Sequence, residues 1–125
     1  PEAFEKYLNP GCPGFVPGVR PSKKEAIELI LESGGRPVLA HPCKIKADAD
    51  KLIRELADYG LWGLEVFYPA STEGQKRGFL SLCAQLGLNA TCGSDFHGKN
   101  RENPIGGPYE KNQVLECAWR EFFER

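Results

Sequence analysis

Three short apolar runs alternate with three helix-like segments, and this alternation restricts the possible folds more than any other feature of the sequence. Each helix-like segment begins at a residue suited to capping and ends at glycine. The helices are expected at residues 22–33, 48–59 and 71–86, and the strands at 37–40, 61–68 and 88–92. Strands that alternate with helices pair in parallel through right-handed crossovers. We therefore predict an α/β fold in which parallel β-strands alternate with helices.

Two further segments flank this core. Residues 9–21 hold four prolines and three glycines, which neither a helix nor a sheet interior accepts easily, so residues 1–21 are expected to form a leader. Residues 22–125 are expected to form the α/β domain. Its last helix is predicted from the apolar spacing of Val114, Leu115, Ala118, Trp119, Phe122 and Phe123.

The composition limits the environment and the partners. With 125 residues, 41% of them apolar, the chain suffices for one domain with a modest core. Its 16 basic and 17 acidic residues give a net charge of −1, which creates no general attraction for nucleic acid or an anionic membrane. No apolar run approaches the roughly 20 residues of a membrane span, and the first residues lack the form of a signal peptide. We expect a cytoplasmic protein without a membrane partner.

The cysteines are interpreted as reduced thiols. There are five, an odd number, and none forms a Cys-x-x-Cys pair. Cys43 and Cys92 lie near the candidate ligands described next and could bind a soft metal, but buried small residues are the commoner case.

Side chains of metal-binding type follow two of the predicted strands. Asp95 and His97 stand two residues apart after the third strand, and His41 follows the first. On an extended backbone, residues i and i+2 project to the same face, so Asp95 and His97 could reach one ion. Functional groups in such folds gather beyond the carboxyl ends of the strands, where His41 also falls. One oxygen and two nitrogens suit Zn²⁺, Fe or Mn²⁺ better than Ca²⁺.

Each of these residues also has a simpler explanation. His41 alone would be read as a capped core histidine, and Asp95 alone as a turn-forming side chain. The combination of Asp-x-His with a histidine at the end of another strand favours the metal.

Four nearby residues have two interpretations each. Lys44 and Lys99 are candidates to bind a substrate phosphate, although a solvated loop lysine is the simpler explanation. Glu65, in the middle of an apolar strand, needs a partner if it is buried, so a structural role has as much support as a catalytic one. Tyr68 could stack on a base, but core packing is the favoured interpretation.

These motifs resemble those of the PHP (polymerase and histidinol phosphatase) family of metal-dependent phosphoesterases. The similar segments are Val38–Pro42 (VLAHP), Gly63–Pro69 (GLEVFYP) and Gly93–Gly98 (GSDFHG). The resemblance covers nearly the whole chain as the C-terminal half of such a domain, and the leader resembles the end of an inserted segment. It implies a distorted (β/α)₇ barrel that holds two or three divalent metal ions and hydrolyses phosphate esters of nucleotides or short nucleic acids. It also implies that His41, Asp95 and His97 are metal ligands.

The chain departs from the family pattern in its ligands. PHP proteins also use a His-x-His motif near the N-terminus and a further His and Glu, which have no counterpart here. We therefore expect the C-terminal half of a barrel, whose N-terminal half is supplied by a longer parent protein and which is inactive alone. A degenerate relative that keeps a partial site is the alternative.

An open parallel sheet predicts a further partner. Its unpaired edge at 37–40 is expected to be relieved by self-association, or by the leader folding back across it.

Two other functions stay open: a nucleotide- or metal-binding module without catalysis, and a barrel metal hydrolase of amidohydrolase type.

Overall fold

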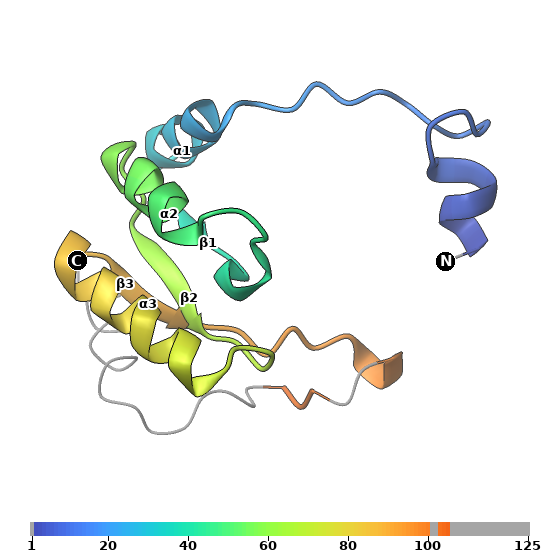
Figure 1. Ribbon diagram of the computed structural model, residues 1–125. Helices are drawn as coiled ribbons and strands as arrows, with labels where there is room; N and C mark the ends of the chain where they lie inside the picture. Colours follow the sequence, from blue (N-terminus) through green and yellow to red (C-terminus); the bar gives the residue numbers. More distant parts are fainter. Residues whose placement is uncertain (1, 101–102, 106–125) are drawn as a thin grey trace.

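The computed structural model describes residues 2–100 and 103–105, and it confirms the α/β class (Figure 1). Along the chain, the main elements are α1 (Lys23–Glu32), β1 (Val38–Leu39), α2 (Ala49–Asp58), β2 (Gly63–Phe67), α3 (Glu73–Leu86) and β3 (Asn89–Cys92). Three short helical turns are η1 (Phe4–Leu8), η2 (Pro42–Lys44) and η3 (Gly98–Asn100). The helix predicted from Val114 to Phe123 lies outside the described residues.

The three strands form one parallel sheet in the order β1-β2-β3. Leu64 of the central strand pairs with Leu39 on one side and with Ala90 on the other. The register shifts between Glu65 and Phe67, where β2 carries one extra residue against β3. Because the strands are parallel, the loops that follow them all emerge where the carboxyl ends of the strands lie.

The helices begin where the sequence predicts. The Ser22 hydroxyl accepts the Glu25 N–H while the Glu25 side chain accepts the Ser22 N–H, which closes a capping box at the start of α1. Thr72 and Gln75 form the same arrangement at the start of α3, and the Asp48 side chain caps α2. These bonds satisfy N–H groups that a helix terminus otherwise leaves unpaired.

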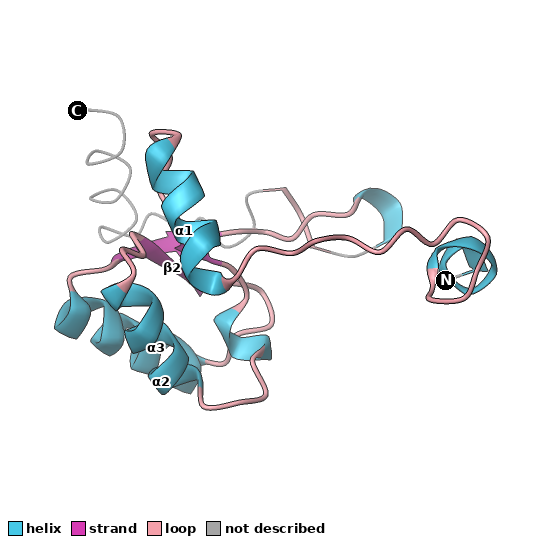
Figure 2. Cartoon of the chain, turned by 90° about the horizontal axis from the view of Figure 1, so that it is seen from above, coloured by secondary structure: helices cyan, strands magenta, loops and turns pink. Residues whose placement is uncertain are grey.

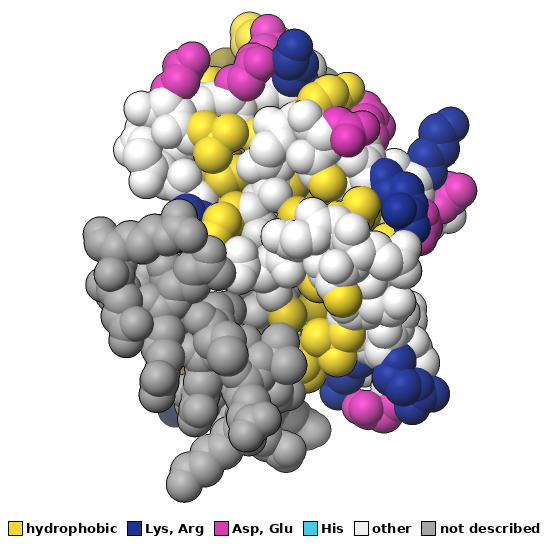
Figure 3. Space-filling model, turned by 90° about the vertical axis from the view of Figure 1, so that its left-hand side faces the viewer, with side chains coloured by type: hydrophobic (Ala, Val, Ile, Leu, Met, Phe, Trp, Pro, Cys, Tyr) yellow, Lys and Arg dark blue, Asp and Glu magenta, His cyan; other side chains and the backbone are white. Residues whose placement is uncertain are grey.

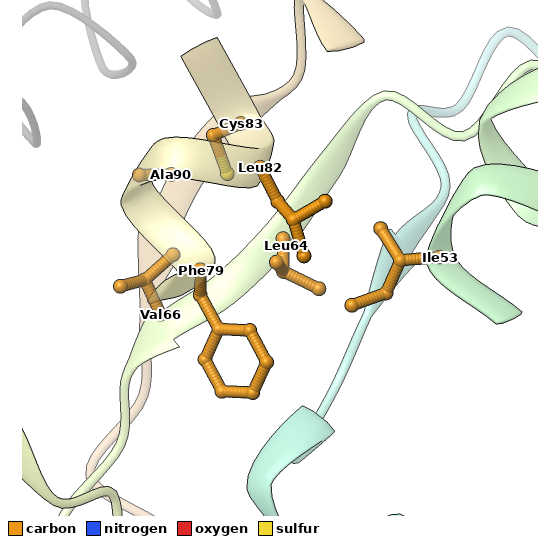
Figure 4. Packing of buried hydrophobic residues seen from close by; sticks show 7 residues of the cluster. All are labelled: Ile53, Leu64, Val66, Phe79, Leu82, Cys83 and Ala90. Carbon is orange, nitrogen blue, oxygen red and sulfur yellow. The ribbon is translucent and has the colours of Figure 1, made fainter. Parts of the chain in front are cut away.

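Helices α2 and α3 lie together on one side of the sheet (Figure 2). They cover the face formed by Leu64 and Val66, whose side chains are fully buried. Ile53 of α2 and Phe79 and Leu82 of α3 belong to the same buried cluster as these two side chains (Figure 4). Burying one such side chain contributes about 1.5–3 kcal/mol, so this layer anchors the central strand. Side chains alternate along a strand, which turns Glu65 toward the opposite face.

The first helix is less well covered. Ile27 joins Leu56 and Leu61 in a second small cluster, whereas the side chains of residues 29–31 are each at least two-fifths exposed. On the face shown in Figure 3, apolar side chains reach the surface between the charged ones. The described part of the fold therefore leaves apolar surface in contact with solvent.

Two expectations about the edges of the fold need correction. The first strand has two residues rather than four and is not buried, since Val38 is 39% exposed and β1 has one neighbouring strand among the described residues. The leader, which contains η1, runs away from the sheet rather than folding back across β1 (Figure 1). No helix in the described ranges combines the length and apolar character needed to cross a membrane.

Candidate metal centre

The loops after β1 and β3 bring the three predicted ligands together. His41 Nε2 lies 4.0 Å from Asp95 Oδ1, and His97 Nδ1 lies 3.5 Å from the same oxygen. The Asp95 side chain is 11% exposed, while the two imidazoles are partly exposed, at 37% and 47%. The carboxylate is thus the most buried of the three groups and lies within 4.0 Å of both imidazoles.

Both loops take an unusual backbone conformation at a candidate ligand. His41 and Asp95 each have φ of 50°, and they are the two non-glycine residues with positive φ in the described part of the chain. Such a conformation costs about 1–3 kcal/mol and clusters at functional sites. His41 also precedes Pro42, which restricts its backbone further.

The expectation that Asp95 and His97 project from an extended backbone is therefore wrong. Strand β3 ends at Cys92, and the chain turns at Asp95 through the left-handed region. The two side chains approach each other because of this turn. Asp and His adopt it more readily than most residues.

Tyr68 contacts both sides of the site. Its hydroxyl donates a 2.8 Å hydrogen bond to Asp95 Oδ2, and its ring centroid lies 4.4 Å from that of His41. Tyr68 is 3% exposed, so the expectation of burial is confirmed, but the expectation of core packing alone missed these contacts. The available signal was its place directly after β2, at the same edge as the two ligand-bearing loops.

Glu65 has the partner that a buried carboxylate needs. Its Oε2 accepts a 2.7 Å hydrogen bond from the His41 N–H and lies 3.6 Å from His41 Nε2. The residue is 9% exposed. The carboxylate of the central strand therefore contacts the loop that follows β1.

The nearby cysteines do not favour a soft-metal site. Burial, and then the negative charge of Glu65, raise the pKa of the Cys92 thiol. The thiolate is the form that binds metal, so a raised pKa weakens Cys92 as a ligand at neutral pH. Cys43 packs against the larger core cluster. The four cysteines in the described part are all free thiols.

The two lysines proposed to bind substrate differ in position. Lys44 Nζ lies 3.9 Å from Asp95 Oδ2 and 4.7 Å from the centroid of the Tyr68 ring, which places a positive charge beside the site. Lys99 is exposed in η3 and makes no salt bridge with a described carboxylate of the site. A role in substrate binding stays a prediction for both.

The donor atoms of the site suit a divalent metal ion. His97 Nδ1 lies 2.6 Å from the main-chain oxygen of Asp95 and can donate to it, which would leave Nε2 as the atom that could bind a metal ion. Two ligands of one ion lie about 3–3.5 Å apart, close to the 4.0 Å between His41 Nε2 and Asp95 Oδ1. No three His, Cys, Asp or Glu side chains among the described residues already converge on a metal position. An ion bound here would therefore draw the imidazoles inward.

Comparisons with known proteins agree with the resemblance. No family model matches the chain. The 3′,5′-nucleoside bisphosphate phosphatase of Chromobacterium violaceum is 30% identical over 98% of this chain and 44% of that protein. The 5′-3′ exoribonuclease Rnm of Salmonella typhimurium is 34% identical over 77% of this chain and 34% of that protein. A phosphoribosyl 1,2-cyclic phosphate 1,2-diphosphodiesterase of Eggerthella lenta is 37% identical over 61% of this chain and 28% of that protein.

Solved structures give the same picture. A Bifidobacterium adolescentis protein described as a metal-dependent phosphoesterase superposes with a TM-score of 0.69 at 28% identity, over 96% of this chain and 42% of that one. A Chromobacterium violaceum amidohydrolase with bound sulfate and no metal gives 0.70 at 31% identity, over 96% and 43%. The chain spans less than half the length of these relatives. Its resemblance to the C-terminal part of PHP-type phosphoesterases is confirmed.

Replacing Tyr68 with Phe tests the contact between β2 and the Asp95 loop. Tyr68→Phe removes the hydroxyl that bonds Asp95, and we expect the free energy of unfolding to fall by about 1–2 kcal/mol in urea denaturation. Tyr59→Phe is the matched control, because its hydroxyl donates to Glu55 at 3.0 Å on the more exposed surface of α2. A loss at Tyr68 no larger than that at Tyr59 would contradict this role.

Proposed function

We propose that this chain belongs to a metal-dependent phosphoesterase that hydrolyses phosphate esters of nucleotides or short nucleic acids. The observation that carries the proposal is the meeting of two imidazoles and one carboxylate, His41, His97 and Asp95, at one edge of a parallel sheet. The names of the three relatives all describe cleavage of phosphate esters, which supports the same reaction class.

The three candidate ligands, Tyr68 and the two lysines each have a role in this proposal. The two histidines and Asp95 Oδ1 would hold the ion, while the Tyr68 hydroxyl on Oδ2 keeps the carboxylate oriented. A bound Zn²⁺, Mn²⁺ or Fe ion would supply a water molecule of lowered pKa and neutralise phosphate oxygens. Lys44, beside Asp95, would attract the phosphate, and Lys99, exposed in η3, is the second candidate for this role.

Experiments distinguish the phosphoesterase from two other functions, an amidohydrolase and a binding module. An amidohydrolase is among the similar structures, so amide substrates belong in any activity screen. A binding module would take up metal or nucleotide without turnover. The phosphoesterase is preferred because the names of the three sequence relatives describe phosphate-ester cleavage.

Metal binding is expected to depend on Asp95. The chain should bind Zn²⁺ or Mn²⁺ in a calorimetric titration, and Asp95→Asn should weaken that binding by more than about tenfold because one anionic donor is lost. Asp58→Asn is the control, since Asp58 is an exposed carboxylate at the end of α2. Equal affinities of the two variants would remove Asp95 from the site.

Activity is expected to need more ligands than these three. Two metal ions about 3.5–4 Å apart require a larger donor set, so we expect little or no turnover from the 125-residue chain alone. We propose that the missing donors come from the N-terminal half of a barrel. In a chimera, this chain replaces the matching part of the Chromobacterium violaceum phosphatase.

The chimera should hydrolyse a nucleoside bisphosphate in a metal-dependent way, and Asp95→Asn should lower the rate by about 100-fold or more. Asp58→Asn should leave the rate unchanged. A folded, metal-loaded chimera that is inactive on phosphate esters, or active on amides instead, would overturn the proposal. Robust turnover by the chain alone would show that its own ligands suffice.

The chain alone is also expected to self-associate. Val38 is exposed on β1, which has one neighbouring strand in the part of the chain that the structure describes, and an unpaired strand edge favours pairing with a second copy. Sedimentation over a concentration series should show association that Val38→Lys reduces. Val19→Lys is the control, because Val19 is fully exposed in the leader. A compact monomer at all concentrations would contradict this expectation.

A further inference from the structure

Glu65 occupies a position that neither the core nor the three proposed ligands explain. It is a carboxylate 9% exposed on the central strand, while its neighbours Leu64 and Val66 face the apolar layer on the other side. Burying a carboxylate is costly unless it is hydrogen-bonded. A leucine or valine here would avoid that cost, so the contacts of the carboxylate need a reason.

The first contact reaches the loop after β1. Glu65 Oε2 accepts the His41 N–H at 2.7 Å, at a residue whose backbone lies in the left-handed region. A hydrogen bond to a charged acceptor is stronger than one to a neutral group. The carboxylate therefore holds the strained turn that carries one proposed ligand.

The second contact reaches the loop after β3. A Cβ atom built on Gly93 would overlap Glu65 Oε1, so the absence of a side chain at residue 93 makes room for the carboxylate. Gly93 has a backbone that does not itself require glycine, because its φ is not positive. The requirement is one of space, and it lies two residues before Asp95.

We propose that Glu65 is a positioning residue that fixes His41 for metal binding, and that Gly93 is required because it leaves space for this carboxylate. The inference rests on the proposed metal site. It treats Glu65, whose Oε2 accepts the His41 N–H and lies 3.6 Å from His41 Nε2, as a support of that residue rather than as a metal donor.

Three variants distinguish support of His41 by Glu65 from direct metal binding by Glu65. Glu65→Gln keeps an oxygen that can accept the His41 N–H but removes the charge. Glu65→Ala removes the acceptor, and Gly93→Ala leaves Glu65 in the sequence but fills its space. Gly78→Ala is the control for the glycine change, because a Cβ at Gly78 meets no atom within 4 Å apart from its chain neighbours and the backbone of its own helix.

The first readout needs no metal. In the metal-free chain, hydrogen exchange of the His41 amide, followed by NMR, should be slow in the wild type, Glu65→Gln and Gly78→Ala. Exchange should be at least about tenfold faster in Gly93→Ala and Glu65→Ala, because the acceptor is displaced or lost. If Glu65→Ala does not fold, Gly93→Ala and Glu65→Gln still decide the question.

The second readout is Zn²⁺ affinity, measured with Zn²⁺ alone against a chromophoric chelator. Gly93→Ala should weaken binding about 10–100-fold, while Glu65→Gln should stay within about threefold of the wild type. If Glu65→Gln weakens binding as much as Asp95→Asn, Glu65 is a metal donor and the inference is wrong. Unchanged exchange in Gly93→Ala would also overturn it. A wild type that binds no Zn²⁺ but shows the expected exchange pattern would reject the metal site and keep Glu65 as the support of His41.

Discussion

The parallel pairing of β2 with both β1 and β3 is the constraint on which the rest of the structure depends. It sets the ends of the outer strands at one edge, so residues 54 positions apart in the sequence, His41 and Asp95, come within 4.0 Å of each other. The central strand β2 is held on one face, where Leu64 and Val66 pack under α2 and α3. Its other side is then available for the polar contacts of Glu65.

Polar side chains from β2 and the residue after it compensate two strained loops. His41 and Asp95 both lie in the left-handed region, and each receives a hydrogen-bonding partner from this strand region, Glu65 for the first and Tyr68 for the second. The cost of such conformations is acceptable only where surrounding contacts determine them. The arrangement is what a site needs if its side chains must be oriented before an ion or substrate binds.

The sequence predicted the helices well and the loops less well, for physical reasons. Capping pairs such as Ser22 with Glu25 act over one turn, so local sequence is sufficient to locate a helix start. The length of β1 depends on neighbouring strands, which local sequence does not reveal. The positive φ of Asp95 and the contact of Tyr68 with it arise only when separate segments meet. The candidate ligands were found because residue type and strand-end position are local signals, whereas the space that Gly93 leaves for Glu65 is not.

The central claim is that the ends of β1 and β3 form one metal site. Crystals of the chain grown with excess Zn²⁺, measured at the zinc absorption edge, test it most directly. The account predicts an anomalous peak about 2.0–2.2 Å from His41 Nε2, Asp95 Oδ1 and His97 Nε2. Zinc bound elsewhere on the chain, or no zinc at the ends of β1 and β3 at saturating concentration, would contradict it.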